Sequence, residues 1–373
     1  MKIIVFMTYG ISMKKWEKIG ILHRELRPYK IIAEKKKIKF IFVTYGAGDD
    51  YQFSSIVPNS KIIPLYDQIK YSKWKTIRFL SSFIAPYRLK KDIYKDAIIK
   101  TNQIWGNWVP ILAKYVWKAP LIVRCGYEPY KNEINNKSSF FFKLSLRFLS
   151  MISYKNANLI ITTTNDIKRF IIKSFNIDEK LILINRNWID TKLFKNDKNI
   201  KRSNKILYVG RLHKEKNIQL LIRAIKNTNI HLDIIGDGEE RNNLKALANS
   251  LSSRVKFLGK VENSSLPKYY NNHRIYIICS NYEGSPKTLL EAMACGAAVI
   301  GTDVPGIKNV IINNKNGLLV KKNSLELLRS IRKLLKDKEL SDQLGIFARD
   351  YIVKKHSLGS YIKKEYKAYR FFN

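Results

Sequence analysis

The stretch RIYIICSNYEGSPKTLLEAMACGAAVIGTD, residues 274–303, has the pattern of a strand, a helix and a second strand. RIYIICS is a short continuous apolar run, which is typical of a buried strand. PKTLLEAMA has helical periodicity, with Ser285 as the expected N-cap and Pro286 at the expected first helical position. AAVIGTD then supplies the next buried strand. A strand–helix–strand unit of this kind predicts a parallel sheet covered by helices.

Two carboxylates lie on either side of the predicted helix start. Glu283 falls in the loop before the helix and Glu291 in its second turn, about 8 Å along the axis from Pro286 at 1.5 Å per residue. The unpaired amides of the first turn lie between them and form a natural phosphate site. This arrangement would fit a sugar–diphosphate–ribose ligand. From the spacing alone, however, a surface glutamate and an unrelated helix glutamate is the favoured alternative.

The same alternation of strand and helix patterns extends through the whole chain. Its strand-like runs are KIIVFMTYG, IKFIFVTYG, APLIVRCG, ANLIITTT, KLILIN, KILYVG, HLDIIGDG, RVKFLG, RIYIICS and AAVIGTD. The alternation predicts an α/β fold with two Rossmann-like, doubly wound domains that face each other across a cleft. Residues 186–205 are polar, charged and without apolar periodicity, which indicates an interdomain linker. The expected organisation is an N-terminal acceptor-side domain at 1–187, a linker at 188–203, a nucleotide-sugar-binding domain at 204–349, and a C-terminal helix at 350–373 that returns to the first domain.

Composition narrows the class of protein. The chain has 373 residues, of which 45% are hydrophobic and 27% charged, as expected for a globular protein. The start, MKIIVFMTYG, has a strand pattern and not that of a signal peptide, and we find no apolar run long enough to cross a membrane. Cys125, Cys279 and Cys295 have no C-x-x-C spacing, which favours a reducing cytoplasm over disulfides or structural zinc.

The formal net charge of +39 suggests an anionic partner. Nucleic-acid binding is one alternative, but both halves of the chain are similarly basic and no nucleic-acid-binding module is recognisable. Lys, Ile and Asn are all abundant, so a general bias in composition is the larger cause. We therefore expect no nucleic-acid partner, and we keep attraction to an anionic membrane surface as a by-product of the charge.

Four segments of the second half follow one another in a recognisable order. They are YVGRLHKEKNIQLLIRAI (208–225), IIGDGEERNNLKALA (234–248), VKFLGKV (255–261) and SNYEGSPKTLLEAMACGAAVIGTDVPGIKNVI (280–311), and NGLLV (316–320) follows them. With these motifs the chain resembles the retaining GT-B glycosyltransferases of glycosyltransferase family 4, the glycosyl transferases group 1. The resemblance is specific from about 204 to 345 and weaker but collinear over the first half.

The resemblance implies a role for each matching residue. Arg211 and Lys216 match the family's cations on the nucleotide diphosphate, where they stabilise the charge of the departing group. Glu283 matches the glutamate that holds donor-sugar hydroxyls beside the anomeric carbon, and Glu291 the one that binds the ribose. Glu283, Arg211 and Lys216 are thus the expected catalytic residues. The expected donor-binding set is Gly210, Arg211, Lys216, Gly236, Gly284, Ser285, Lys287, Thr288 and Glu291.

The reaction that the resemblance implies is sugar transfer from a nucleotide-diphosphate sugar, with retention and with no metal or other cofactor. Two carboxylates could instead indicate glycoside hydrolysis, but the two cations favour a diphosphate leaving group. A nucleotide-sugar epimerase of the same fold is the nearest alternative. The expected acceptor is a glycan or a lipid-linked molecule in bacterial surface polysaccharide or lipopolysaccharide synthesis. The sequence specifies neither the sugar, nor the base, nor the acceptor.

The first half departs from the family pattern at its expected acceptor site. Many relatives have His-Gly after the strand that here ends in Arg124, Cys125 and Gly126. Arg124 and Glu128 are the candidates to replace the histidine, and the free thiol is not expected to act as a nucleophile. The expected acceptor-side residues are Gly10, Arg124, Cys125, Gly126 and Glu128. In the second half, Pro305 and Asn309 replace the usual Gly and Glu in a loop that we do not expect to be catalytic.

Two basic stretches of the first half, 23–39 and 70–91, suggest a peripheral association with the inner face of the cytoplasmic membrane. The second stretch interleaves Trp74, Phe79, Phe83 and Tyr87 with Lys and Arg, as interfacial segments do. The alternative is a solvated basic face whose aromatic side chains pack inward, and the sequence favours neither. The aromatic run at 138–152 is better explained as a core helix than as a membrane-facing one.

Overall fold

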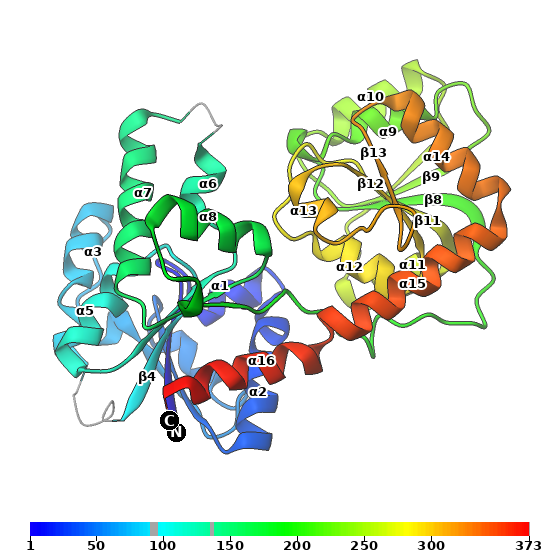
Figure 1. Ribbon diagram of the computed structural model, residues 1–373. Helices are drawn as coiled ribbons and strands as arrows, with labels where there is room; N and C mark the ends of the chain where they lie inside the picture. The colour runs from blue at the N-terminus through cyan, green and yellow to red at the C-terminus, as the bar shows by residue number, and fades with distance from the viewer. Residues whose placement is uncertain (90–95, 135–137, 373) are drawn as a thin grey trace. The chain divides into compact units, whose positions relative to one another are not determined.

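The computed structural model describes residues 1–89, 96–134 and 138–372. The chain forms two compact units, one from residues 1–186 together with 361–373 and the other from residues 187–360. Each unit contains one parallel sheet with helices on both faces (Figure 1). The expectation of an α/β protein with two Rossmann-like domains is confirmed.

The sheet of the first unit has seven strands in the order β3-β2-β1-β4-β5-β6-β7. β1 pairs in parallel with β2 on one side and β4 on the other, so that Ile4 lies between Ile41 and Ile99. The strand order reverses at β1, and doubly wound sheets bind ligands at such switch points. The strands are β1 (Lys2–Phe6), β2 (Lys39–Thr44), β3 (Lys61–Pro64), β4 (Ala97–Thr101), β5 (Leu121–Cys125), β6 (Leu159–Thr162) and β7 (Ile182–Ile184).

The sheet of the second unit has six strands in the order β10-β9-β8-β11-β12-β13. Its first strand, β8, is again central, and the order reverses between β8 and β11. The C-terminal ends of these two strands therefore open the loops of one switch point. The strands are β8 (Ser203–Val209), β9 (Leu232–Ile235), β10 (Val255–Gly259), β11 (His273–Ile278), β12 (Ala298–Thr302) and β13 (Leu318–Val320).

Apolar side chains alternate between the two faces of each sheet, and helices cover both faces. Ile4 and Phe6 belong to one core of the first unit, whereas Ile3 and Val5 belong to the other. The helices of this unit are α1 (Met13–Lys18), α2 (Leu22–Lys36), α3 (Lys75–Ser82), α4 (Ala85–Arg88), α5 (Trp108–Trp117), α6 (Pro129–Glu133), α7 (Phe140–Lys155) and α8 (Asn165–Phe175). Period-two alternation thus gives this sheet two cores.

The second unit repeats this arrangement. Ile206 and Tyr208 face one core, and Leu207 and Val209 face the other. Its helices are α9 (Ile218–Ala224), α10 (Arg241–Ser250), α11 (Leu266–Asn272), α12 (Lys287–Ala294), α13 (Pro305–Lys308), α14 (Ser324–Lys336) and α15 (Lys338–His356). α15 packs against α12, the helix that follows the Glu283 loop.

The strand-like runs that we recognised in the sequence omit β3 and β4, and NGLLV was recognised only as a motif and not as β13. β4 is the most instructive of these, because it lies beside the central strand β1 and is entirely buried. Its sequence, AIIKT, contains Lys100, and a lysine argues against a buried strand. The side chain of Lys100 is nevertheless fully buried, where it forms an ion pair with Glu365.

Two segments connect the units in sequence. Residues 188–203, which the composition marks as a linker, lie in the second unit, where Ile189 and Phe194 are buried in its core. The C-terminal segment is broken at Ser357, between α15 and α16 (Leu358–Tyr369). Residues 361–373 belong to the first unit, and there Glu365 and Tyr369 are buried.

Candidate active site

The candidate donor site lies at the C-terminal ends of β8, β9 and β11 in the second unit. β8 leads into Gly210, Arg211 and the short 3-10 helix η5 (Lys214–Lys216). β11 leads into the Glu283 loop and then into α12. Because β8 and β11 are neighbours in the sheet, the η5 loop and the Glu283 loop meet. The backbone amide of Asn281 donates to the carbonyl of Glu215 at 2.8 Å and joins the two loops.

Lys216 and Glu283 form the central ion pair of this site. The Lys216 Nζ lies 2.8 Å from Glu283 Oε1, and the two side chains are 15% and 11% exposed. The Ser280 hydroxyl donates to the same carboxylate oxygen at 2.7 Å. Two of the three predicted catalytic residues are therefore in direct contact although they are far apart in sequence. Low exposure strengthens the pair, since nearby water screens it less.

The backbone of Glu283 is supported by the start of α13, which the sequence did not connect with the site. The expectation of a loop from Pro305 was wrong, because Pro305–Lys308 form this short helix. A Cβ on Gly306 would lie only 2.0 Å from the Glu283 carbonyl oxygen, so only glycine fits there without a shift. The Thr302 hydroxyl also donates to the carbonyl of Ser280 at 2.8 Å. Sequence reasoning missed Ser280 and Gly306. The position of Ser280 directly after a buried strand was the available signal.

Arg211 is the third predicted catalytic residue, and it is exposed. Its Nη2 lies 3.3 Å from Glu215 Oε1, and its side chain is 77% exposed. The preceding Gly210 is in close contact with Gly236, where a Cβ would lie 1.8 Å from the Gly210 carbonyl oxygen. Gly236 also has a φ of +135°, which favours glycine. These two predicted donor-site glycines thus allow the ends of β8 and β9 to approach each other.

Glu291 is nearly buried, with 3% of its surface exposed. Its carboxylate accepts hydrogen bonds from Asn263 Nδ2 and from the Tyr270 hydroxyl, both at 3.0 Å. Burial, and then the Glu291 carboxylate, raise the pKa of Tyr270, so the phenol stays protonated and remains a donor. The carboxylate is therefore held in one orientation. Asn263 comes from the short 3-10 helix η6 (Asn263–Ser265) and Tyr270 from α11, and no sequence motif indicated them.

The helix after Glu283 begins one residue later than predicted. α12 starts at Lys287, and Pro286 is its N-cap with φ −73° and ψ 105°. The assignment of Ser285 as N-cap and Pro286 as first helical residue was wrong, because Pro286 itself has an extended ψ. Its ring offers no side-chain acceptor for the amides of the first turn. Thr288, in this turn, accepts a hydrogen bond from the Tyr276 hydroxyl at 2.8 Å. Gly284, Ser285, Lys287 and Thr288 are partly exposed around this helix start.

The predicted acceptor-side residues of the first unit have mainly internal partners. The Glu128 side chain is the N-cap of α6 and accepts from the Lys131 amide and the Ser150 hydroxyl. Burial raises the pKa of the Glu128 carboxyl, and these hydrogen bonds partly oppose the shift. Cys125 is fully buried, and the Tyr154 hydroxyl donates to its Sγ at 3.2 Å. A contact of either side chain with an acceptor stays a prediction.

The other three acceptor-side residues are less enclosed. Gly10 has a φ of +74° in the turn that lies between β1 and α1. The Gly126 amide donates to Gln103 Oε1 at 3.0 Å, which links the ends of β5 and β4. Arg124 is partly exposed. Burial lowers the pKa of its guanidinium, but the charges of Tyr361 and Glu365 outweigh this and raise the pKa. The roles of these residues toward an acceptor likewise stay predictions.

An apolar hollow of about 550 Å³ lies at the edge of the first sheet that carries the predicted acceptor-side residues. It opens where β1, β4 and β5 end, and α7 provides one wall. Aromatic and aliphatic side chains dominate the lining, which no sequence motif indicated. Its residues are Thr8, Gln103, Ile104, Trp105, Tyr127, Pro129, Glu133, Phe142 and Leu146. We refer to it below as the apolar hollow.

Neither a metal cluster nor a membrane-spanning helix is found in the part of the chain that the structure describes. Among residues 1–89, 96–134 and 138–372, no three His, Cys, Asp or Glu side chains come together as metal ligands. Within the same ranges, no helix has the length and apolar character needed to cross a bilayer.

Two Rossmann-like domains are typical of GT-B glycosyltransferases, and comparison with known proteins identifies the family of this chain. The family model described as glycosyl transferases group 1 matches residues 190–351. An uncharacterized glycosyltransferase of Haemophilus influenzae is 32% identical over 330 residues, which are 83% of this chain and 89% of that protein. The chain therefore belongs to the glycosyl transferases group 1, glycosyltransferase family 4, whose members are retaining, nucleotide-sugar-dependent enzymes.

Further similarity extends to a relative of stated activity and to a solved structure. GalNAc-alpha-(1->4)-GalNAc-alpha-(1->3)-diNAcBac-PP-undecaprenol alpha-1,4-N-acetyl-D-galactosaminyltransferase of Campylobacter jejuni is 28% identical over 270 residues, 70% of this chain and 71% of that protein. The crystal structure of Anabaena Alr3699/HepE in complex with UDP has a TM-score of 0.76 and 16% identity, and the match covers 100% of both chains. The latter similarity concerns the GT-B fold alone.

Proposed function

We propose that this enzyme transfers a sugar from a nucleotide-diphosphate sugar to a glycan or lipid-linked acceptor in bacterial surface polysaccharide or lipopolysaccharide synthesis. The observation that carries the proposal is the Lys216–Glu283 pair beside the start of α12. One cation, one carboxylate and a helix N-terminus lie together there, as a donor with a charged middle and neutral hydroxyl ends requires. The Campylobacter relative, by its name, extends an undecaprenol-diphosphate-linked glycan.

The ion pair has a specific consequence for donor binding. Lys216 can contact the diphosphate only by sharing its ammonium between the phosphate and Glu283, or by leaving Glu283. When Lys216 leaves, the oxygen that it contacts becomes available to the sugar hydroxyls; when the ammonium is shared, that contact remains and the hydroxyls bind the other lone pairs of the carboxylate. Ser280 keeps the carboxylate in place, because its hydroxyl donates to the same oxygen. In this proposal donor binding exchanges an internal ion pair for one with the substrate.

Arg211 is suited to hold the diphosphate as the leaving group departs. It is exposed, and its partner Glu215 lies on the same loop and is itself 43% exposed. A surface pair of this kind is weak, typically about 0–1 kcal/mol, so its exchange for a diphosphate is easy. Glu291, oriented by Asn263 and Tyr270, would accept hydrogen bonds from the ribose at the other end of the donor.

The acceptor part of the proposal draws support from the apolar hollow of the first unit. A pocket lined mainly by apolar and aromatic side chains suits a ligand with an apolar portion. A lipid-linked acceptor has such a portion next to its sugar. With this acceptor the enzyme would work at the inner face of the cytoplasmic membrane as a peripheral protein.

The test begins with the donor. Purified protein is screened by thermal shift against nucleotide diphosphate sugars that differ in base and sugar, since a bound donor raises the midpoint of unfolding. The best donor is then incubated with the protein alone and with membrane lipid extracts or oligosaccharide acceptors. We expect release of the nucleotide diphosphate that depends on acceptor, and a product with retained anomeric configuration. Conversion of the donor sugar without any acceptor would identify an epimerase instead.

The Glu283→Ala variant is the control for chemistry. It removes the carboxylate beside the reacting carbon, so kcat should fall by a factor on the order of 100 or more, as for other groups that act mainly in the transition state. Nucleotide affinity should change little. A variant with wild-type kcat would exclude the proposed role of Glu283.

A further inference from the structure

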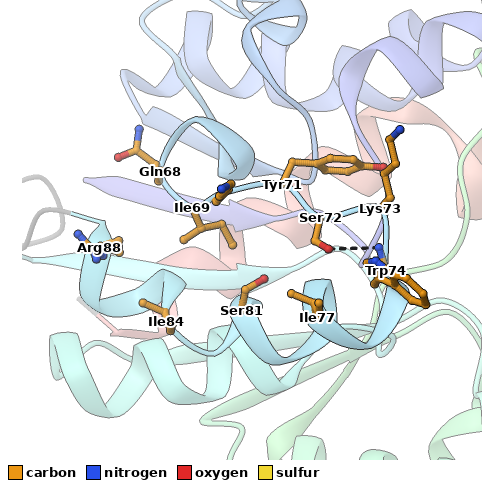
Figure 2. A pocket seen from close by; sticks show the side chains of 11 residues that line it. Gln68, Ile69, Tyr71, Ser72, Lys73, Trp74, Ile77, Ser81, Ile84 and Arg88 are labelled. Carbon is orange, nitrogen blue, oxygen red and sulfur yellow. Dashed lines mark hydrogen bonds between the residues drawn. The ribbon is translucent and has the colours of Figure 1, made fainter.

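A second hollow of the first unit, of about 720 Å³, lies between residues 68–74 and the outer face of α3 and α4. Figure 2 shows Ile77, Ser81 and Ile84 pointing from these helices toward the segment that carries Ile69 and Tyr71. Trp74 lies at one end of the hollow and Arg88 at the other (Figure 2). Neither the donor site nor the apolar hollow includes any of these residues.

The helices beside this hollow have an apolar stripe on their exposed face. Ile77, Leu80, Ile84 and Tyr87 recur every three or four residues and are 50%, 65%, 50% and 64% exposed. The Trp74 side chain, before α3, is 73% exposed. A surface helix usually turns its apolar stripe toward a core. A grouped set of exposed large apolar side chains instead indicates an interaction surface.

Another side of the same segment packs against α5. Phe79 and Phe83 lie 5.0 and 6.5 Å from the ring of Trp108, centroid to centroid. The sequence left open whether the aromatic residues of this segment pack inward or face outward. The structure shows a gradation: Phe79 and Phe83 contact Trp108 of α5 but remain 40% and 37% exposed, whereas Trp74 and Tyr87 are 73% and 64% exposed. The exposed stripe is thus additional to the packing that holds α3 in place.

The charges of the hollow have one sign. Lys70, Lys73 and Arg88 are exposed and line it, and among the described residues no lining side chain is acidic. Arg78 adds a fourth cation nearby, where it donates to the Tyr71 hydroxyl at 2.6 Å. Lys90 and Lys91, the end of the basic stretch found in the sequence, lie outside the described residues. Cations that surround an apolar stripe are complementary to a surface with anionic headgroups above an apolar layer.

We propose that this hollow and stripe are a docking site for an anionic phospholipid bilayer. Lys70, Lys73 and Arg88 bind lipid phosphates, and the side chains of Trp74, Ile77, Leu80, Ile84 and Tyr87 enter the interface between headgroups and acyl chains. The inference specifies the membrane part of the proposed function and rests on that part alone, not on the transfer chemistry.

The neighbouring aromatic residues extend this surface toward the apolar hollow. Trp108, which contacts α3, lies 5.8 Å from Trp105, and Trp105 lines the apolar hollow together with Phe142 of α7. The same end of α7 exposes Phe140 and Phe141 by 73% and 81%. The expectation that the run at 138–152 is a core helix therefore holds only for its C-terminal part, where Leu146 and Leu149 are buried. Docking through α3 would bring lipid close to the pocket proposed for a lipid-linked acceptor.

The experiment measures binding of the full chain to vesicles of phosphatidylcholine with and without phosphatidylglycerol, in the absence of donor. We expect co-sedimentation with the anionic vesicles only, and weaker binding as salt is added. The triple variant Lys70→Glu, Lys73→Glu and Arg88→Glu should lower the partition coefficient on the order of 100-fold, given the usual contribution of each basic residue near anionic lipid. The variant Ile77→Ser, Leu80→Ser and Ile84→Ser should also reduce binding although it keeps every charge.

A matched control separates the site from the general charge of the protein. Lys245, Lys333 and Lys336 are exposed on α10 and α14 of the second unit. Their replacement by Glu gives the same net charge as the first triple variant and should leave binding almost unchanged. Equal losses in both triple variants would contradict a specific site. The proposal would also be contradicted if the wild-type protein stayed in the supernatant with anionic vesicles at low salt. It would equally be contradicted if the apolar stripe mediated dimerisation and no vesicle binding.

Two further measurements complete the design. Trp74 fluorescence, obtained as the difference between wild type and Trp74→Phe, should shift to shorter wavelength on vesicle binding. An unchanged spectrum would place Trp74 outside the interface and contradict the proposal. The Glu283→Ala variant should bind vesicles like wild type, so a failure of the chemistry and a failure of docking can be told apart.

Discussion

Two lysine–glutamate pairs, one in each unit, contrast a buried structural ion pair with a more open pair for which we propose a function. Lys100 and Glu365 are 0% and 1% exposed, and both come from regular elements, β4 and α16. Lys216 and Glu283 are 15% and 11% exposed and come from loops at the end of a sheet. The first pair has internal partners on all sides, whereas the second lies where a ligand can reach it.

The buried pair is part of a closed network. The Lys100 ammonium also donates to the Tyr29 hydroxyl at 2.9 Å, and Glu365 accepts from Tyr369 and from Asn185, both at 2.9 Å. Burial by itself would raise the pKa of the Glu365 carboxyl, but the Lys100 ammonium, together with the charge of Arg124 and the Tyr369 hydroxyl, outweighs it and holds this pKa below its usual range. The network fixes the last helix of the chain to the central part of the first sheet.

The largest predicted effect is the loss of this buried pair. Lys100→Ala leaves the Glu365 carboxylate buried without its ion-pair partner. Glu365→Ala leaves the Lys100 ammonium buried without its ion-pair partner. Each should lower the free energy of unfolding by about 3–5 kcal/mol, measured by urea denaturation. Lys367→Ala, on the exposed face of the same helix, is the matched control and should change it by less than about 0.5 kcal/mol. A small effect in Lys100→Ala would show that water or rearrangement compensates the pair.

The second prediction concerns the open pair. Lys216→Ala and Arg211→Ala should each lower kcat/KM by an amount equivalent to about 2–4 kcal/mol, since each removes a cation that we propose stabilises the departing diphosphate. The free energy of unfolding should hardly change for Arg211→Ala, because its side chain is exposed. Steady-state kinetics with the identified donor provide the measurement, with Lys214→Ala in the same loop as the control. A near-wild-type Arg211→Ala enzyme would exclude the diphosphate role.

Glu291 is expected to show a smaller effect, mainly on binding. A ribose contact is nearly the same in the ground and transition states, so Glu291→Ala should raise KM and the Kd of the nucleotide more than it lowers kcat. The loss should be about 1.5–3 kcal/mol, as for hydrogen bonds to a charged group. Glu291→Gln keeps an acceptor for Asn263 or Tyr270 and serves as the control for packing. Equal effects on kcat in Glu283→Ala and Glu291→Ala would contradict the separate roles.

The buried pair also predicts how stability depends on pH. Because the folded-state pKa of Glu365 lies below the value of an ordinary glutamate, ionisation of this carboxyl stabilises the fold. The contribution is complete above the unfolded-state pKa, about 4.3, and is lost as the pH falls through the folded-state value. The free energy of unfolding, measured from pH 7 down to acid, should therefore fall less steeply in Glu365→Gln than in wild type. Parallel slopes would contradict this assignment.

The same contrast explains what the sequence could predict. The two residues of the open pair were predicted as site residues, because they belong to a recognisable series of motifs in loops at the ends of parallel strands. Their direct contact was not predicted. The buried pair was not predictable, because its partners are distant in sequence and lysine argues against a buried strand. For that reason β4 was missed, although it lies next to the centre of the first sheet.

The residues that support the donor site were also beyond sequence reasoning, for a geometric reason. Gly306 is required only because the Glu283 carbonyl oxygen lies against it, and Asn263 and Tyr270 matter only because α11 packs beside α12. Such contacts depend on how elements pack in three dimensions. The start of α12 was predicted within one residue, which is the usual accuracy for a helix end.

The smallest effect is expected from chelation. Arg211, Lys216 and the first turn of α12 already place positive charge where a diphosphate would bind, which is the role that a divalent metal ion has in other transferases. The transfer rate should therefore be unchanged, within about a factor of two, in excess EDTA. Lys216→Ala provides the sharper test, because the loss of one cation should make the enzyme more responsive to added Mg²⁺. If wild-type activity disappears in EDTA and returns with Mn²⁺ or Mg²⁺, the two cations do not suffice, and the distinction between the open and the buried pair loses its mechanistic basis.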